Sequence, residues 1–140
     1  MRDLIAARTE LAAGAYTCVL CRDGVMRRAT QRGVAPLLAF LEEDTDFHGF
    51  CAADKVVGRG AAFLYVLLGV SAVYAEVISE AALSVLQKAD VAVEYNALVP
   101  YIKNRQGNGP CPIEQATLSI DTASEALPAI RKTLQALRAK

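Results

Sequence analysis

The side chains of this 140-residue chain most able to do chemistry are four cysteines and a scattered set of acids. Cys18 and Cys21 have the spacing of a redox or metal-binding pair. They lie in a β-branched, apolar run from Tyr16 to Cys21, whereas a thioredoxin-type pair needs a helix N-terminus. Strand residues three apart point to opposite faces. We therefore interpret both residues as buried structural thiols.

Cys51 and Asp54 begin the stretch 51–68, which is small or apolar after Arg59 and stops at Gly69. This pattern predicts a long buried helix. Asp54 would then cap the first turn. Alternatively, the free N–H groups of that turn would bind an anion and favour a reactive Cys51 thiolate, with Lys55 and Arg59 as a cationic wall.

Further candidates follow in the next elements. Glu76 stands in the apolar stretch 73–78, an expected strand, where a carboxylate needs either a partner or a wet face. Ser79 and Glu80 would begin the following helix, as a cap or as ligand contacts at the carboxyl edge of the sheet.

The segment 104–112 is rich in glycine and proline and is expected to be irregular. Within it, Asn104 and Arg105 could contact a ligand, Arg105 by a bidentate bond to phosphate or carboxylate. The segment lacks the Gly-Lys-Ser/Thr ending of a phosphate-binding loop. Cys111 follows as a second thiol candidate. His48, the single histidine, lies in a polar loop, either solvent-exposed or catalytic.

The elements that must position these residues follow from periodicity. Leu4, Ala7 and Leu11 share a helical face, and Asp23-Gly24 is a strong hairpin signal between strands at 16–21 and 25–29. Further on we expect a short helix with Pro36 in its first turn, strands at 73–78, 91–95 and 117–120, and a last helix starting near 122–124 with Pro128 in its first turn. The alternation of strands and helices predicts an α/β domain with parallel neighbours.

Bulk composition limits the class of protein. The chain is 54% hydrophobic and 21% charged, with 15 basic and 15 acidic residues, so no charge excess favours nucleic acid or an anionic membrane. The uncharged stretch from Gly60 to Ala75 is shorter than the ~20 residues of a membrane span, and the N-terminus lacks a signal-peptide core. We expect one cytoplasmic domain, 1–140, with reduced cysteines.

Five segments together resemble a known family: 16–21, 32–38, 52–58, 73–80 and 104–114. They are similar to an uncharacterised bacterial and archaeal family, a domain of unknown function with a cytidine-deaminase-like fold. The resemblance implies a three-layer α/β/α architecture with a mixed sheet of about five strands. It carries no activity to this chain.

Zinc deaminases hold their metal with a His or Cys two residues before a Glu, and with a Pro-Cys-x-x-Cys. At the expected first position this chain has Cys51 and Asp54, with the acid one residue too late, and at the second position Ser79 with no thiol. At most, Cys51, Cys111 and His48 could come together as metal ligands. We therefore expect no zinc and no other cofactor.

The leading hypothesis is a small-molecule binding protein, or a zinc-independent enzyme, whose pocket joins 51–59, 76–80 and 104–111. A nucleotide or other anionic metabolite would suit a helix N-terminus and Arg105. One alternative is a non-catalytic interaction module, a homo-oligomer that self-associates through its apolar helices. The other is a thiol enzyme that uses Cys51 or Cys111.

Overall fold

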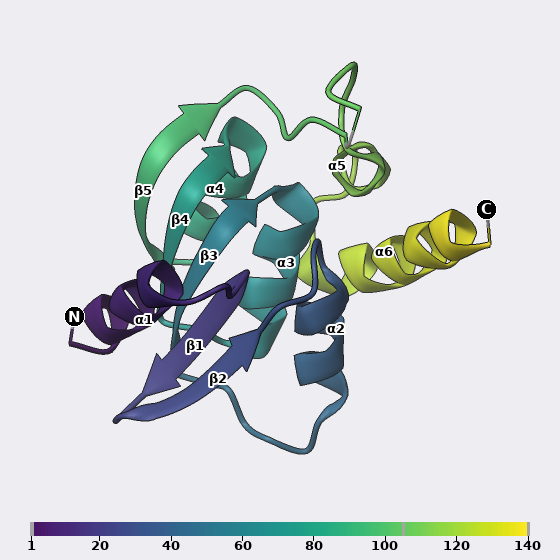
Figure 1. The fold of residues 1–140 in the computed structure, drawn as a ribbon. Coiled ribbons are helices and arrows are strands. Elements are labelled where there is room, and N and C mark those ends of the chain that lie inside the picture. Colours follow the sequence, from purple (N-terminus) through teal and green to yellow (C-terminus); the bar gives the residue numbers. More distant parts are fainter. Residues whose placement is uncertain (1, 105, 140) are drawn as a thin grey trace.

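A computed structural model describes residues 2–104 and 106–139 of the chain (Figure 1). In chain order its elements are α1 (Arg2–Ala13), β1 (Cys18–Arg22), β2 (Val25–Ala29), α2 (Ala35–Glu42), β3 (Cys51–Val57), α3 (Arg59–Leu68), β4 (Ala72–Ser79), α4 (Glu80–Lys88), β5 (Ala92–Val99), α5 (Pro112–Ala116) and α6 (Ala123–Arg138). None of the helices in the described ranges is both long and apolar enough to cross a membrane.

The strands form one five-stranded sheet in the order β2-β1-β3-β4-β5. β1 is antiparallel to β2 and β3, whereas β3, β4 and β5 are mutually parallel. The hairpin between β1 and β2 turns at Asp23 and Gly24, which both have positive φ, as a type I′ turn requires. The expected fold class is confirmed: a mixed α/β protein whose five-stranded mixed sheet is flanked by helices.

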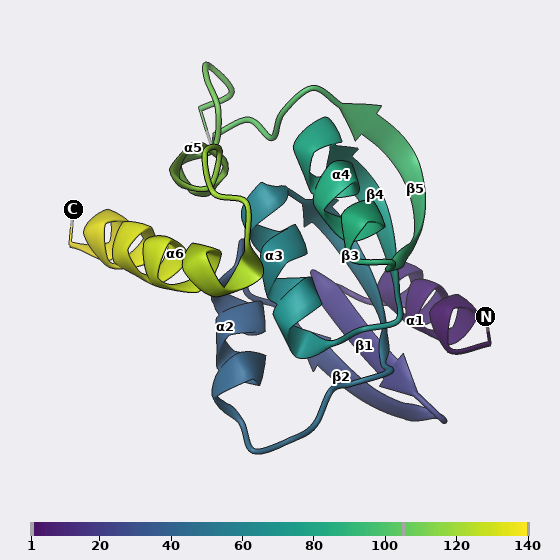
Figure 2. The same cartoon turned by 180° about the vertical axis from the view of Figure 1, so that it is seen from behind.

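The helices cover the two sheet faces unequally (Figures 1 and 2). α1 alone packs on one face, mainly over β1 and β3 and less over β4. α2, α3 and α4 pack on the other face, and α6 lies outside α3. Cys18 belongs to the core under α3, and Cys21 to the core under α1. The two thiols therefore occupy opposite faces of the sheet, as predicted.

The predicted helix 51–68 is wrong in its first half. Residues Cys51–Val57 form β3, Gly58 is extended, and α3 begins only at Arg59. Both faces of β3 are covered, so its small residues are buried without an alternating pattern. Such a run cannot be told from a buried helix by periodicity. The end of α3 was predicted correctly, because Gly69 has a φ of 79° and its N–H bonds the carbonyls of Tyr65 and Val66.

Three further differences lie in the second half of the chain. The expected strand 117–120 is a turn after α5, closed by bonds from the Thr117 N–H to the Ile113 carbonyl and from the Ile120 N–H to the Thr117 carbonyl. The strand expected at 91–95 extends to Val99. α6 begins at Ala123 as expected, but Pro128 then falls in its second turn.

Candidate functional site

A buried network of three polar side chains links β1, β3 and α3. The Tyr65 hydroxyl donates to Asp54 Oδ2 at 2.6 Å, and Cys18 Sγ lies 3.1 Å from the same hydroxyl oxygen. The backbone N–H of Val56 donates to Asp54 Oδ1 at 3.2 Å. Asp54 is 8% exposed and Tyr65 is fully buried. Neither expectation for Asp54 holds: it neither caps a helix nor stands at a helix N-terminus, but is a core carboxyl facing α3.

The electrostatics of this network favour neutral groups. Burial raises the pKa of Asp54 to about 7, although the hydrogen bonds from Tyr65 and the backbone act in the opposite direction. Burial, together with the nearby Asp54 charge, also raises the pKa of Cys18 and that of Tyr65 well above their usual values. The Cys18 thiol is thus protonated at neutral pH and is a poor nucleophile. Asp54 is the one member able to exchange a proton near neutrality.

The N-terminus of α3 is occupied by a carboxylate of the chain itself. Glu114, which is buried, accepts from the backbone N–H of Arg59 at 2.5 Å and from that of Ile102 at 3.2 Å. Gly58 allows this approach, because a Cβ there would lie 2.7 Å from Glu114 Oε2. The helix N-terminus suited to an external anion therefore already holds an internal one.

The Arg59 side chain fastens the segment after α5 to α3. Its Nε donates to the Thr117 carbonyl at 2.7 Å, and its Nη2 donates to the Ile120 carbonyl. The guanidinium carbon also lies 5.1 Å from the centre of the Phe63 ring. The predicted cationic wall of Lys55 and Arg59 therefore does not form, since Lys55 is exposed and Arg59 is bound to carbonyl groups.

The other candidate residues at the carboxyl end of the parallel strands make contacts within their own segments. Ser79 caps α4, accepting from the Ala82 N–H at 3.1 Å, as one of the two interpretations expected, and Glu80 follows it in the first turn. The Asn104 side-chain Nδ2 donates to Asn108 Oδ1 at 2.9 Å, and Asn104 Oδ1 accepts from the backbone N–H of Asn108 at 3.2 Å. These two bonds close the loop. Arg105 lies outside the described residues.

The structure separates residues that the predicted pocket would join. Cys51 opens β3 and pairs with Ala72, so Ser79 lies seven positions further along β4. At ~3.3 Å per residue, this separation is about 23 Å. His48 precedes β3 and therefore lies at the end of the sheet where Cys51 is. Cys111 lies at the opposite end, where its N–H bonds the Ile102 carbonyl beyond the end of β5. These cysteines and the histidine therefore do not converge. Across residues 2–104 and 106–139, no group of three or more His, Cys, Asp or Glu side chains is placed to hold a metal ion.

A groove of about 330 Å³ lies between α1 and the sheet, and we call it the α1 groove. α1 packs mainly over β1 and β3 and less over β4, and the groove lies along this weaker contact. Its lining combines apolar and polar side chains: Ile5, Arg8, Thr9, Leu11, Ala12, Tyr74 and Glu76. A second groove of about 290 Å³ lies between α3, α4 and the start of α6. Neither groove includes a member of the buried Asp54 network.

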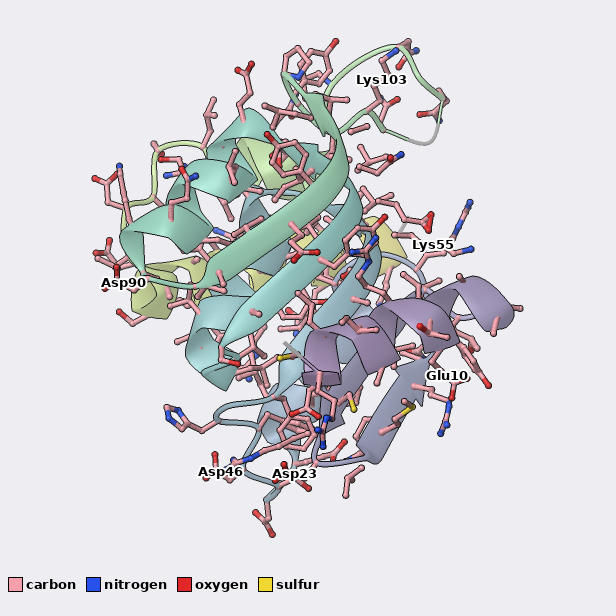
Figure 3. The ribbon with its side chains drawn as sticks, turned by 90° about the vertical axis from the view of Figure 1, so that its left-hand side faces the viewer. Glu10, Asp23, Asp46, Lys55, Asp90 and Lys103 are labelled. Carbon is pink, nitrogen blue, oxygen red and sulfur yellow. The ribbon has the colours of Figure 1, made fainter. Side chains whose placement is uncertain are left out.

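The α1 groove contains one carboxylate without a charged partner. Arg8 is paired with Glu94 of β5 at 2.8 Å, and its guanidinium carbon lies 4.1 Å from the centre of the Tyr74 ring. Within the described residues, Glu76 makes no ion pair within 4.0 Å. Lys55 occupies the neighbouring position on β3 and points to the side of the sheet that α1 covers (Figure 3). Sequence reasoning singled out Glu76 but missed Arg8 and Tyr74.

Comparison with known proteins identifies the family. The model of the TM1506 family, a domain of unknown function (DUF1893), matches residues 6–134. The chain belongs to this family. The expected membership of a domain-of-unknown-function family is thereby confirmed, at this level.

One solved structure shows the same fold as this DUF1893 domain. It is the crystal structure, at 2.70 Å resolution, of a DUF1893 family protein (TM1506) from Thermotoga maritima. The two chains are 22% identical, with a TM-score of 0.85, and the match covers 96% of this chain and 89% of that one. At this identity the likeness shows the fold alone. No curated protein matches the chain.

Proposed function

We propose that this DUF1893 domain binds a small molecule in the α1 groove, on a deaminase-like fold that works without the deaminases' zinc. The observation that carries the proposal is Glu76, a partly buried carboxylate on a central strand, which lines the groove without a charged partner. A volume of about 330 Å³ is at the small end of ligand sites, which span roughly 300–1,000 Å³.

The lining indicates the chemistry of the ligand. A carboxylate in a partly apolar groove favours a cation or a strong hydrogen-bond donor, because a charged pair there is screened less than in open water. Ile5, Leu11 and Ala12 would contact an apolar part of the same molecule. We therefore propose a small amine or guanidine with an apolar body. An anionic metabolite at the start of α3 has less support, because Glu114 occupies that helix end.

Binding is favoured over catalysis in this groove. Its lining contains no cysteine and no histidine, and the perturbed Asp54 carboxyl faces α3 on the opposite side of the sheet. The thiol-enzyme alternative has little support, because Cys51 is buried and neither Cys51 nor Cys111 lines either groove. A zinc-independent enzyme remains the alternative if a ligand found by binding is also converted.

The test is thermal unfolding in the presence of small amines and guanidines, each matched with a neutral analogue of the same shape. A ligand at a hundred times its Kd stabilises by about 2.7 kcal/mol, which raises Tm by about 10 °C in a domain of this size. Glu76→Gln should abolish the increase, whereas the exposed Glu42→Gln should leave it unchanged. The proposal fails if no amine stabilises the protein, or if the increase in Tm survives Glu76→Gln.

A further inference from the structure

β5 is an open edge of the sheet. Its eight residues, Ala92–Val99, bond to β4 on one side. Figures 1 and 2 show it as the outermost strand, and none of the described segments packs along its other side. Tyr95 and Leu98 are each 43% exposed. The outward N–H and C=O groups of such a strand are ready to pair with another strand.

The two edges of the sheet differ in how they are protected. β2 carries two arginines, Arg27 paired with Glu43 and Arg28 paired with Glu10, and charged side chains on an edge discourage pairing with another chain. The β5 sequence AVEYNALV contains no lysine, arginine, proline or glycine. Its one charged residue, Glu94, is neutralised by Arg8 at 2.8 Å. Charged residues, which hinder strand addition, are therefore more numerous on β2, with two arginines, than on β5, with one glutamate.

Opposite charges stand at the two ends of β5. Asp90 precedes the strand and Lys103 follows it, both are exposed, and Figure 3 shows them at opposite ends. Neither makes an ion pair within 4.0 Å in the described part of the chain. In an antiparallel pair of two β5 strands, each Asp90 lies near Lys103 of the second copy. A parallel pair would instead place like charges together.

We propose that two copies of this chain associate through their β5 strands, antiparallel about a two-fold axis, so that the two sheets become one. The arrangement is self-complementary, as a two-fold interface requires. Centring the axis between Asn96 and Ala97 sets Asp90 opposite Lys103 and also keeps the two Glu94 side chains from facing each other. One strand pair is smaller than a standard interface of ~1,600 Å², so we expect a Kd in the micromolar range. The proposed contact uses β5, none of whose residues lines the α1 groove.

Sedimentation velocity between about 1 μM and 1 mM covers the expected range of Kd. The mass of the wild-type protein should increase from 15.0 kDa toward twice that value. Tyr95→Lys adds a positive charge to each strand at the interface and should weaken association more than tenfold. Lys103→Glu should weaken it about tenfold, because the new carboxylate faces Asp90. The matched control is Val25→Lys, at a 59% exposed position on the β2 edge, which should have no effect.

The inference is overturned if the wild-type protein stays monomeric throughout, or if Tyr95→Lys and Val25→Lys change its mass equally. Hydrogen exchange of the wild-type protein gives a second measurement that needs no variant to fold. Amides of 92–99 should gain protection as concentration rises, while those of 25–29 should not. Self-association without added protection in β5 would place the interface elsewhere and refute the proposal.

Discussion

Asp54→Asn should stabilise this protein at alkaline pH, although it removes a buried charge that is hydrogen-bonded. The pKa of Asp54 is raised by burial from an ordinary 3.8 to about 7. The folded state therefore binds a proton more tightly than the unfolded state, and folding stability declines as pH rises from about 4 to 7. A pKa difference of about three units, at 1.36 kcal/mol per unit, is a loss of about 4 kcal/mol at pH 8.5.

Asparagine removes the charge but keeps most of the contacts. Its oxygen can accept from the Tyr65 hydroxyl or from the Val56 N–H, but it cannot replace both carboxylate oxygens. The bond that is lost costs about 1–2 kcal/mol. We therefore expect Asp54→Asn to be about 2–3 kcal/mol more stable than wild type at pH 8.5. At pH 4.5, where the folded wild-type carboxyl is protonated, the variant should be equal or less stable.

Urea unfolding at pH 4.5, 6.0 and 8.5 measures this difference directly. Asp44→Asn is the control, because Asp44 is exposed and its substitution should leave the pH profile unchanged. The difference between wild type and Asp54→Asn should change sign or grow by at least about 2 kcal/mol across this range. A constant difference, or a variant less stable at pH 8.5, would show that Asp54 does not hold a costly charge, and would refute the argument.

Two further predictions concern the carboxyl end of the sheet and the thiols. Glu114→Gln replaces a charged acceptor at the backbone N–H groups of Arg59 and Ile102, and should lower the free energy of unfolding by about 1.5–3 kcal/mol in urea titrations; no loss would mean that the helix end is satisfied without the carboxylate. In the folded protein, iodoacetamide should modify Cys111 first, because the other three cysteines are buried, and mass spectrometry of the labelled peptides would show the order. Faster labelling of Cys51 would revive the thiol-enzyme hypothesis.

Local signals in the sequence were predictive wherever the bonding partner is near in the chain. The hairpin at Asp23-Gly24 needs only its own backbone conformation, and Ser79 caps an N–H three residues later. Thr122 likewise accepts from the backbone of Glu125. Each of these contacts is complete within four residues, so residue type and spacing suffice to predict it.

The misinterpreted features depend on contacts distant in sequence. Glu114 is 55 residues from Arg59, so nothing near it in the chain indicates its role at the helix end. Asp54 was placed on a helix because the first four residues of β3, 51–54, are buried on both faces, which hides the period of a strand. Once it was misplaced, its bond to Tyr65 could not be inferred. The α1 groove was missed for a third reason, since it depends on how far α1 extends over the sheet.

The contacts of Arg59 also determine where the chain can be shortened. The sheet is complete at Val99, so the last forty or so residues look like an appendage that could be trimmed. The first residue of α3 nevertheless holds that segment twice, by its backbone amide to Glu114 and by its guanidinium to two carbonyls. Ile113 and Ile130 also pack against Gly60 in the next position of the helix. A fragment ending at Val99 would remove all of these contacts and expose the first turn of α3 to solvent. The smallest stable unit must therefore include most of α6.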